Sequence, residues 1–502
     1  MRRRELLALP GVAALPAAAQ SSLPLADKQP GAGFAERDIT PAIGSEQPGN
    51  YYKRYNESVH DPCKVRAAVF TDGATTAALV SVDALIVPRA IVLAARQRIA
   101  KMTSIAADAV LIGATHTHSG GPVGMVQPGE FDGAPPHVQQ LAKLSTEADP
   151  KYLARVEDAI VDAVAEAFRS RKAYQCGVAS GIEEKSAFNR RFHMKNGQTW
   201  THPQAGNPDM LETAGPVDPE VGVIGAFEGG RLVGCVVSFA CHATTNPGGI
   251  SANWIYYLEK TIRAVHGPDV VVVFLPGATG DVTQVDNRSP YRQPTGEQWA
   301  KLVGGRVGAE ALKCLVSMTP GALAPVRVAS KTLDVARRKP SKARVEKATA
   351  LATPAVQTTA QWVFAKETVM LDWLISRYPT APVEVQALQI GPVVFAANPS
   401  EYFCQFGLDI KKGSRFPFTW PVMLANGCVG YVPTEEAMGP GGGGYETRLT
   451  TYSNLRVTAG TEIKQASLEL IATLTPGATP VPPARPPFKA PWDYGSVPPE
   501  TS

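Results

Sequence analysis

The sequence lacks the features that mark several common classes of protein. It has 7 cysteines in 502 residues and no C-x-x-C pair, which argues against a disulfide scaffold and against a thiolate zinc ribbon. It contains no G-x-S-x-G motif of an α/β-hydrolase and no Gly-Lys-Ser/Thr ending of a phosphate-binding loop. No basic cluster follows the N-terminus and the formal net charge is only +4, so nucleic acid is not an expected partner. After the N-terminal region no run reaches about 18 apolar residues, so we expect no transmembrane segment in the mature chain.

The first residues have the pattern of an export signal. Three arginines, Arg2 to Arg4, precede an apolar run over residues 6–19 that ends in consecutive alanines. A basic head, a short apolar centre and small residues at the end predict a signal peptide over residues 1–19, of the Sec or the twin-arginine type. We therefore expect an exported protein, periplasmic or secreted.

The rest of the chain divides by composition. Hydrophobic residues make up 44% of the sequence, enough for a large buried core. Residues 20–50 are rich in Pro, Gly and polar groups and predict an extended N-terminal arm. Residues 51–475 predict one large catalytic domain, and residues 476–502 a proline-rich tail that is an extended strap or disordered.

Apolar periodicity indicates alternating strands and helices. A hairpin over residues 65–70 and 77–87, a helix over 89–102 and a strand over 109–113 form a βαβ-like unit. Further elements are predicted along the chain: a helix from Pro150 to about 171, strands over 221–227, 232–241, 270–275, 383–390 and 393–397, and helices over 255–265, 297–316 and 343–374. This order predicts an α/β fold, a mixed β-sheet core flanked by helices.

Polar residues that can bind a metal follow three of the predicted strands. His116 and His118 lie two residues apart at the end of the strand over 109–113, and His242 ends the strand over 232–241. Glu401 follows the strand over 393–397. Two or three imidazoles with a carboxylate are typical of a hydrolytic zinc site. On sequence alone, a hydrogen-bonded core histidine remains an alternative for His242.

A glycine-containing segment follows another predicted buried strand. Gly277 and Gly280 permit a tight turn whose peptide N–H groups can face an anion, and Asp281 and Thr283 can present oxygens to the same cavity. An ordinary strand-to-helix loop explains the segment equally well.

Four strings in a fixed order resemble the neutral/alkaline ceramidases. They are GATHTHSG at 113–120, FACHATT at 239–245, GDVT at 280–283 and GYVPT at 430–434. The resemblance covers about residues 50–470 and implies a zinc-dependent hydrolase that cleaves the N-acyl amide bond of ceramide or a ceramide-like lipid. It also implies that transient contact with a membrane surface is possible. The sequence departs from the family's full-length enzymes in one respect, because we expect a single catalytic domain without the added immunoglobulin-like domain.

The resemblance implies roles for individual residues. One zinc ion is expected on four ligands: His116, His242, Glu401 and Tyr431. The other expected site residues are His118, Arg190, Tyr445 and Thr283.

Thr283 departs from the family pattern, because a serine stands at this position of the family's box. Thr283 keeps the hydroxyl and adds a methyl group. Two further readings stay open: a zinc esterase or amidase for another small substrate, and a non-catalytic exported lipid-binding homologue.

Overall fold

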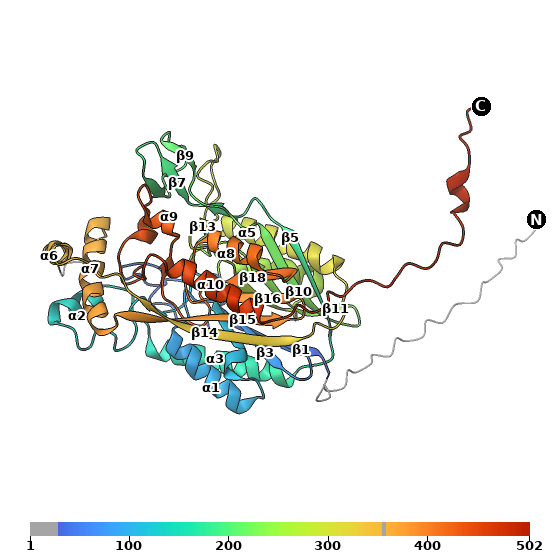
Figure 1. Cartoon of the computed structure of the whole chain (residues 1–502), viewed down its shortest axis with the longest axis horizontal. Helices are drawn as coiled ribbons and strands as arrows, with labels where there is room; N and C mark the ends of the chain where they lie inside the picture. The colour runs from blue at the N-terminus through green and yellow to red at the C-terminus, as the bar shows by residue number, and fades with distance from the viewer. Residues whose placement is uncertain (1–28, 354–357) are drawn as a thin grey trace, which may run out of the picture.

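The computed structural model describes residues 29–353 and 358–502 (Figure 1). The predicted signal peptide over residues 1–19 lies outside the described residues. Within them, helices cover mixed sheets, which confirms the expected α/β class.

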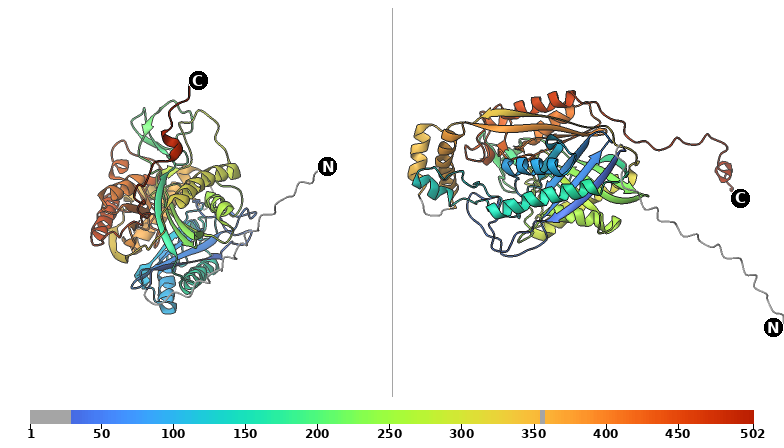
Figure 2. Two further views of the ribbon diagram at one scale, coloured as in Figure 1. Left: turned by 90° about the vertical axis from the view of Figure 1, so that its right-hand side faces the viewer. Right: turned by 90° about the horizontal axis from the view of Figure 1, so that it is seen from below.

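The first sheet has the order β1-β2-β3-β4 and carries the predicted βαβ-like unit. Its strands are β1 (Gly31–Asp38), β2 (Lys64–Thr71), β3 (Thr76–Val82) and β4 (Val110–Ala114). Helices α1 (Arg89–Met102) and α3 (Pro150–Arg169) lie across this sheet (Figure 2). The side chain of Asp149 caps α3 by accepting from the backbone N–H of Lys151 and Tyr152, as the Asp-Pro start predicts. Strands β3 and β4 are parallel, so the βαβ prediction is confirmed.

The second and third sheets complete the core. The second has the order β12-β11-β10-β5 and packs against helices α4 and α5, and the third has the order β14-β15-β16-β18 and packs against α10. The members are β5 (Gln175–Ile182), β10 (Glu220–Glu228), β11 (Arg231–Phe239), β12 (Val271–Pro276), α4 (Trp254–His266), α5 (Gly296–Ser317), β14 (Val326–Ala336), β15 (Thr380–Ile390), β16 (Val393–Ala397), β18 (Phe418–Val422), α8 (Cys404–Gly413) and α10 (Ala459–Ala472). Strand β12 contacts β2, β3, β4 and β18, so all three sheets meet around it.

Short elements decorate this core. Strands β7, β8 and β9 form a small sheet that projects from the body near α9 (Figure 1). The remaining elements are α2 (Pro136–Ala142), β6 (Phe188–Asn189), β7 (Arg191–Met194), β8 (Thr199–Thr201), β9 (Met210–Thr213), β13 (Val282–Thr283), α6 (Lys342–Leu351), α7 (Ala360–Arg377), β17 (Glu401–Tyr402), β19 (Tyr431–Val432) and α9 (Glu435–Met438).

Two segments differ from the expectation. The helix predicted over residues 343–374 is wrong as one element, because α6 ends at Leu351 and α7 begins at Ala360. Pro354 stands between them in the sequence, and proline removes a helical N–H donor and clashes with the preceding turn. The arm expected over residues 20–50 contains β1, which pairs antiparallel with β2 along its full length and so belongs to the first sheet.

The proline-rich tail leaves the body of the protein. Residues 481–502 are exposed, and they extend away from the core (Figure 1). Among the described helices, none combines the length and the hydropathy needed to cross a bilayer.

Candidate active site

Three parallel strand pairs bring three of the predicted metal ligands to one place. Strand β4 is parallel to β3, β11 to β12, and β16 to β18. His116, His242 and Glu401 each follow the carboxyl end of one of these strands, where open α/β sheets form their ligand sites. The strand-end positions noted in the sequence therefore meet in space.

The two imidazoles converge on one oxygen of the Glu401 carboxylate. Oε2 of Glu401 lies 3.3 Å from Nε2 of His116 and 3.1 Å from Nε2 of His242. All three residues are at most 1% exposed. The site is therefore shielded from bulk solvent. Electrostatic interactions between its groups are stronger than they would be in water.

Backbone carbonyls orient both imidazoles. Nδ1 of His116 lies 2.9 Å from the carbonyl oxygen of Leu85, and Nδ1 of His242 lies 3.0 Å from that of Val282. A ring that donates from Nδ1 presents the Nε2 lone pair, so both lone pairs face the Glu401 carboxylate. Acceptor atoms this close need a shared cation or proton between them. The donor set thus fits a metal ion.

His118 extends this cluster. Its Nε2 lies 3.3 Å from Nε2 of His116, and the ring nitrogens of His116, His118 and His242 all lie within 4.8 Å of one another. This histidine group could hold a metal ion. Gly49, at a φ of 88°, packs on the His118 ring, because a Cβ there would lie 2.5 Å from Nδ1 of His118.

The backbone of the site is strained at His116. His116 has a φ of 63°, in the left-handed region that residues with a side chain seldom adopt. Such strain costs about 1–3 kcal/mol and persists where the surroundings over-determine it. The turn directs the two histidines of the His-x-His pair to a common point.

Burial sets the protonation states that a metal requires. Burial, with the positive charge of Arg190 nearby, lowers the pKa of His242 to about 4. Burial likewise lowers the pKa of His118 well below its usual value. Burial alone would raise the pKa of Glu401, but His116 and His242 hold it well below its usual range. At neutral pH the site therefore offers the neutral imidazoles of His118 and His242 and an ionised Glu401 carboxylate.

Tyr431 reaches the same site from a neighbouring strand. Glu401 and Tyr431 are direct partners in the parallel pair β17–β19, so both side chains leave the same region of the backbone. The Tyr431 hydroxyl lies 3.1 Å from that of Tyr445 and accepts a 3.2 Å hydrogen bond from Nη2 of Arg190. Burial raises the pKa of both tyrosines, so the phenols remain protonated.

Arg190 lies at the centre of these contacts. It donates to the carbonyl of Gly280 at 2.7 Å and to Oε1 of Glu446 at 2.8 Å, and its Nη1 lies 3.4 Å from Nε2 of His242. Burial alone would lower the pKa of Arg190, but Tyr445, Tyr431 and Glu446 raise it well above its usual value. A charged guanidinium is thus held beside the histidines.

Five of the predicted site residues line a cavity of about 170 Å³: His116, His118, Glu401, Tyr431 and Tyr445. His242 and Arg190 contact this group but are not among the lining residues. Residues not expected from the sequence also line the cavity, among them Gly49, Asn50, Tyr51, Leu85 and Tyr452. These residues are not predicted metal ligands and belong to none of the four family strings. They reach the cavity through long-range packing, which the sequence pattern does not indicate. Glu446 was also missed, although it directly follows the predicted Tyr445.

Residues 277–281, which follow β12, form hydrogen bonds that connect neighbouring parts of the fold. The N–H groups of Gly277 and Gly280 donate to the carbonyls of Phe239 and Tyr402, so they do not form the anion-binding turn that was one alternative. The Asp281 carboxylate accepts from the backbone N–H of Cys404 and from Asn189 Nδ2, both at 2.8 Å. These bonds tie the segment to α8 and to β6.

Thr283 lies next to the carbonyl that orients His242. Its hydroxyl donates to Oε1 of Gln284 at 2.8 Å and lies 3.4 Å from the hydroxyl of Thr244. Thr283 is buried, and it is not among the residues that line the 170 Å³ cavity.

Comparisons with known proteins bear on the fold. No protein-family model matches the sequence, and no curated protein matches it. Among solved structures, a ceramidase complexed with C2 matches with a TM-score of 0.67 and 17% identity, over 90% of this chain and 77% of that chain. The neutral ceramidase from Pseudomonas aeruginosa matches with a TM-score of 0.66 and 18% identity, over 91% and 77%. The chain has the neutral ceramidase fold, which confirms the fold that the motifs imply.

Proposed function

We propose that the protein is a zinc-dependent amidase that cleaves the N-acyl amide bond of a lipid-like substrate. The observation that carries this proposal is the convergence of His116, His242 and Glu401, with Nε2 to Oε2 distances of 3.3 and 3.1 Å, in a ceramidase fold. In the proposal, Tyr431 is the fourth ligand of one zinc ion per chain. When bound there, zinc acts as a Lewis acid on the amide carbonyl and lowers the pKa of water.

The protein's own groups would handle charge and protons. Glu401 is ionised, so its carboxylate can accept the proton of a water molecule that attacks the amide carbon. Arg190 is positively charged and contacts both His242 and the Tyr431 hydroxyl, so in the proposal it stabilises the oxyanion that forms on the carbonyl oxygen. The water oxygen becomes part of the acid product as the carbon–nitrogen bond breaks.

The leaving amine needs a proton. Tyr445 remains a phenol because of burial, and its hydroxyl lies 3.1 Å from that of Tyr431, so it is placed to donate. His118 is a neutral imidazole beside His116 and can relay a proton between the site and the amine. Thr283 would contribute a hydroxyl to the site, either as a nucleophile or as a hydrogen-bonding group.

A substrate screen tests the proposal. Purified protein, loaded with zinc or stripped of metal, is incubated with N-acyl sphingosines, N-acyl amino acids and simple esters. We expect zinc-dependent release of a fatty acid and an amine in equal amounts, detected by mass spectrometry. Cleavage of esters alone would instead support a zinc esterase. Lipid binding without turnover in the zinc-loaded protein would support a binding protein.

We also propose export of the mature chain, from the basic head and apolar run of residues 1–19. Mass spectrometry of exported material should find an N-terminus near Gln20. An intact N-terminal segment on exported protein would contradict this.

A further inference from the structure

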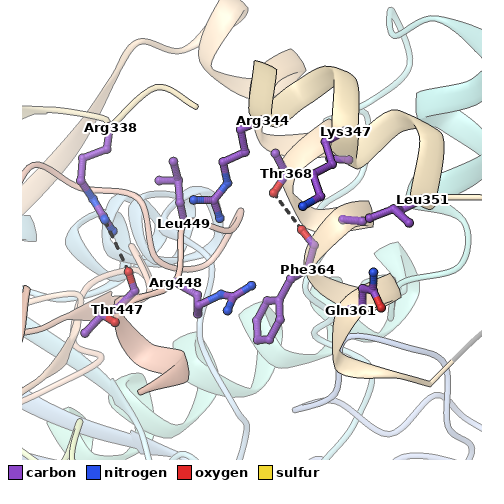
Figure 3. A pocket seen from close by; sticks show the side chains of 12 residues that line it. Arg338, Arg344, Lys347, Leu351, Gln361, Phe364, Thr368, Thr447, Arg448 and Leu449 are labelled. Atoms are coloured by element: carbon purple, nitrogen blue, oxygen red, sulfur yellow. Dashed lines mark hydrogen bonds between the residues drawn. The ribbon is translucent and has the colours of Figure 1, made fainter. Parts of the chain in front are cut away.

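A second cavity lies beyond the candidate active site. It has a volume of about 560 Å³ and lies between α6, α7 and the segment of residues 447–449. Figure 3 shows Arg344 and Lys347 extending from α6 toward Arg448 and Phe364 on the opposite side. Leu351 and Leu449 contribute an apolar part of the wall. The cavity can thus hold a molecule that is partly apolar and partly charged.

The charge of this cavity is of one sign. Four cationic residues line it, and no Asp or Glu does so in the described part of the chain. They are Arg338, Arg344, Lys347 and Arg448. Among the residues described, Arg344, Lys347 and Arg448 form no ion pair with a carboxylate. Positive charge gathered in a concave site without counter-charge attracts anions.

Two of the arginines, Arg338 and Arg448, are held in place by contacts that do not neutralise them. Arg338 donates to the carbonyls of Leu455 and Ser453 at 2.9 and 3.1 Å. The Arg448 guanidinium lies 4.3 Å from the centre of the Phe364 ring. Burial, with Arg344 nearby, lowers the pKa of Arg338 to about 10, so it is still charged at neutral pH. Fixed guanidinium groups are suited to bind carboxylate or phosphate oxygens.

Phe364 connects the basic cavity with the candidate active site. Its ring centre lies 6.3 Å from that of Tyr51, which lines the site cavity. Phe364 and Arg448 also line a trough of about 700 Å³, and Tyr445 lines both this trough and the site cavity. The trough therefore adjoins the basic cavity at Phe364 and Arg448, and it adjoins the site cavity at Tyr445.

We propose that this basic cavity binds an anionic group of the substrate, so that the substrate is an N-acyl amide with a phosphate or carboxylate remote from its amide bond. The inference rests on the proposed amidase function and narrows its substrate class. A neutral headgroup would leave the cations uncompensated, whereas an anionic group would satisfy them. The apolar wall then accommodates the carbon chain next to the anion.

Direct binding tests the subsite without any turnover. The full-length protein is titrated with octyl phosphate, octanoate and the neutral octyl glucoside, and the dissociation constants are measured by calorimetry. We compare wild type with the double variant Arg344→Glu/Lys347→Glu, whose changed residues are exposed on α6. Lys342→Glu is the matched control, because it alters the same helix and lies outside the cavity lining. Thermal unfolding of each variant verifies that it folds.

We expect at least one of the two anions to bind wild type and the Lys342→Glu control with equal dissociation constants. The same anion should bind the double variant at least about tenfold more weakly. Which anion binds more tightly separates a phosphate from a carboxylate preference. Equal weakening by the control, or binding of octyl glucoside as tight as that of both anions, would overturn the subsite.

Turnover then tests whether the subsite serves the substrate. N-dodecanoyl-6-aminohexanoate is compared with its neutral methyl ester, following amide cleavage only. We expect wild type to prefer the anionic compound in kcat/KM, and this preference to fall at least about tenfold in the double variant. An unchanged preference, with anion binding intact, would overturn the assignment of the cavity to the substrate. Anion binding without cleavage of any N-acyl amide would instead contradict the proposed function and leave the anion site standing.

Discussion

The carboxylate of Glu401 lies 3.1 Å from Nε2 of His242, although 159 residues separate them in the chain. His242 donates from Nδ1 to the carbonyl of Val282, which leaves its Nε2 as an acceptor. The carboxylate oxygen of Glu401 is also an acceptor. Acceptors at this distance repel unless a cation or proton lies between them. The relationship leads to a direct prediction about metal content.

We expect one zinc ion per chain in the purified protein and its loss in His242→Ala. Removing a ligand from a site of this kind lowers metal affinity by orders of magnitude. Elemental analysis by mass spectrometry measures the content, and chelation should abolish activity that added zinc restores. His137→Ala, on the exposed part of α2, is the control and should keep its metal. Full zinc content in His242→Ala would contradict the ligand assignment.

Much of the site can be found in the sequence because its ligands follow apolar strands. His116, His242 and Glu401 each stand where a run of buried residues ends, and the carboxyl ends of parallel strands form ligand sites. A strand that is buried on both faces is a short apolar run rich in β-branched residues, and turn residues mark where it ends. Its end is therefore visible without any knowledge of its neighbours.

The rest of the site depends on long-range contacts that no local pattern carries. Gly49 and Asn50 belong to the segment that is predicted as an arm, yet both line the cavity, and Gly49 packs against His118. Glu446 gains its role only because it meets Arg190, 256 residues away. The break between α6 and α7 was missed because apolar residues continue with helical spacing on both sides of Pro354.

Glu446 should act as a positioning residue for Arg190. Its Oε1 lies 2.8 Å from Nε of Arg190, and its side chain is fully buried. In Glu446→Gln the guanidinium loses its charged partner, so we expect kcat to fall about 10- to 100-fold, with zinc retained. Leaving a buried charge unpaired also costs about 3–5 kcal/mol of unfolding free energy.

Two comparisons separate positioning from general damage. Glu446→Asp keeps the charge and should recover part of kcat, whereas Glu436→Gln, exposed on neighbouring α9, should alter neither kcat nor stability. A Glu446→Gln protein with wild-type kcat at full zinc content would remove Glu446 from this role.

Glu259 should make stability depend on acidic pH. Its carboxylate accepts from Nε and Nη2 of Arg66 at 2.9 and 2.6 Å, and from Lys64 at 2.8 Å. Burial alone would raise the pKa of Glu259, but Arg66, Lys64 and Arg263 lower it to about 2. Because the folded-state pKa lies below the unfolded value of about 4.3, the stabilisation is present above that value and is lost as pH falls toward 2.

Urea unfolding of wild type and Glu259→Gln between pH 3 and 7 measures this contribution. We expect the variant to be less stable by about 3 kcal/mol at pH 7, and the difference to shrink steadily below about pH 4.5. The exposed Glu212→Gln is the control and should show no such trend. A difference that is constant over the whole pH range would contradict the role of the Glu259 charge.

Thr283 is the position at which this chain departs from the ceramidase motif, and its hydroxyl can be tested directly. If the hydroxyl takes part in the chemistry, Thr283→Ala should lose more than about a thousandfold in kcat while zinc content and unfolding temperature stay unchanged. Thr283→Ser should keep or raise kcat, because it keeps the hydroxyl and removes a methyl group.

Thr244→Ala is the matched control, since Thr244 lies 3.4 Å from the Thr283 hydroxyl and also donates to Gln284. If the hydroxyl only supports the segment through Gln284, Thr283→Ala and Thr244→Ala should both cost at most about 10- to 100-fold, equivalent to about 1.4–3 kcal/mol. We expect the larger loss at Thr283 alone, and near wild-type activity of Thr283→Ala would leave water as the nucleophile.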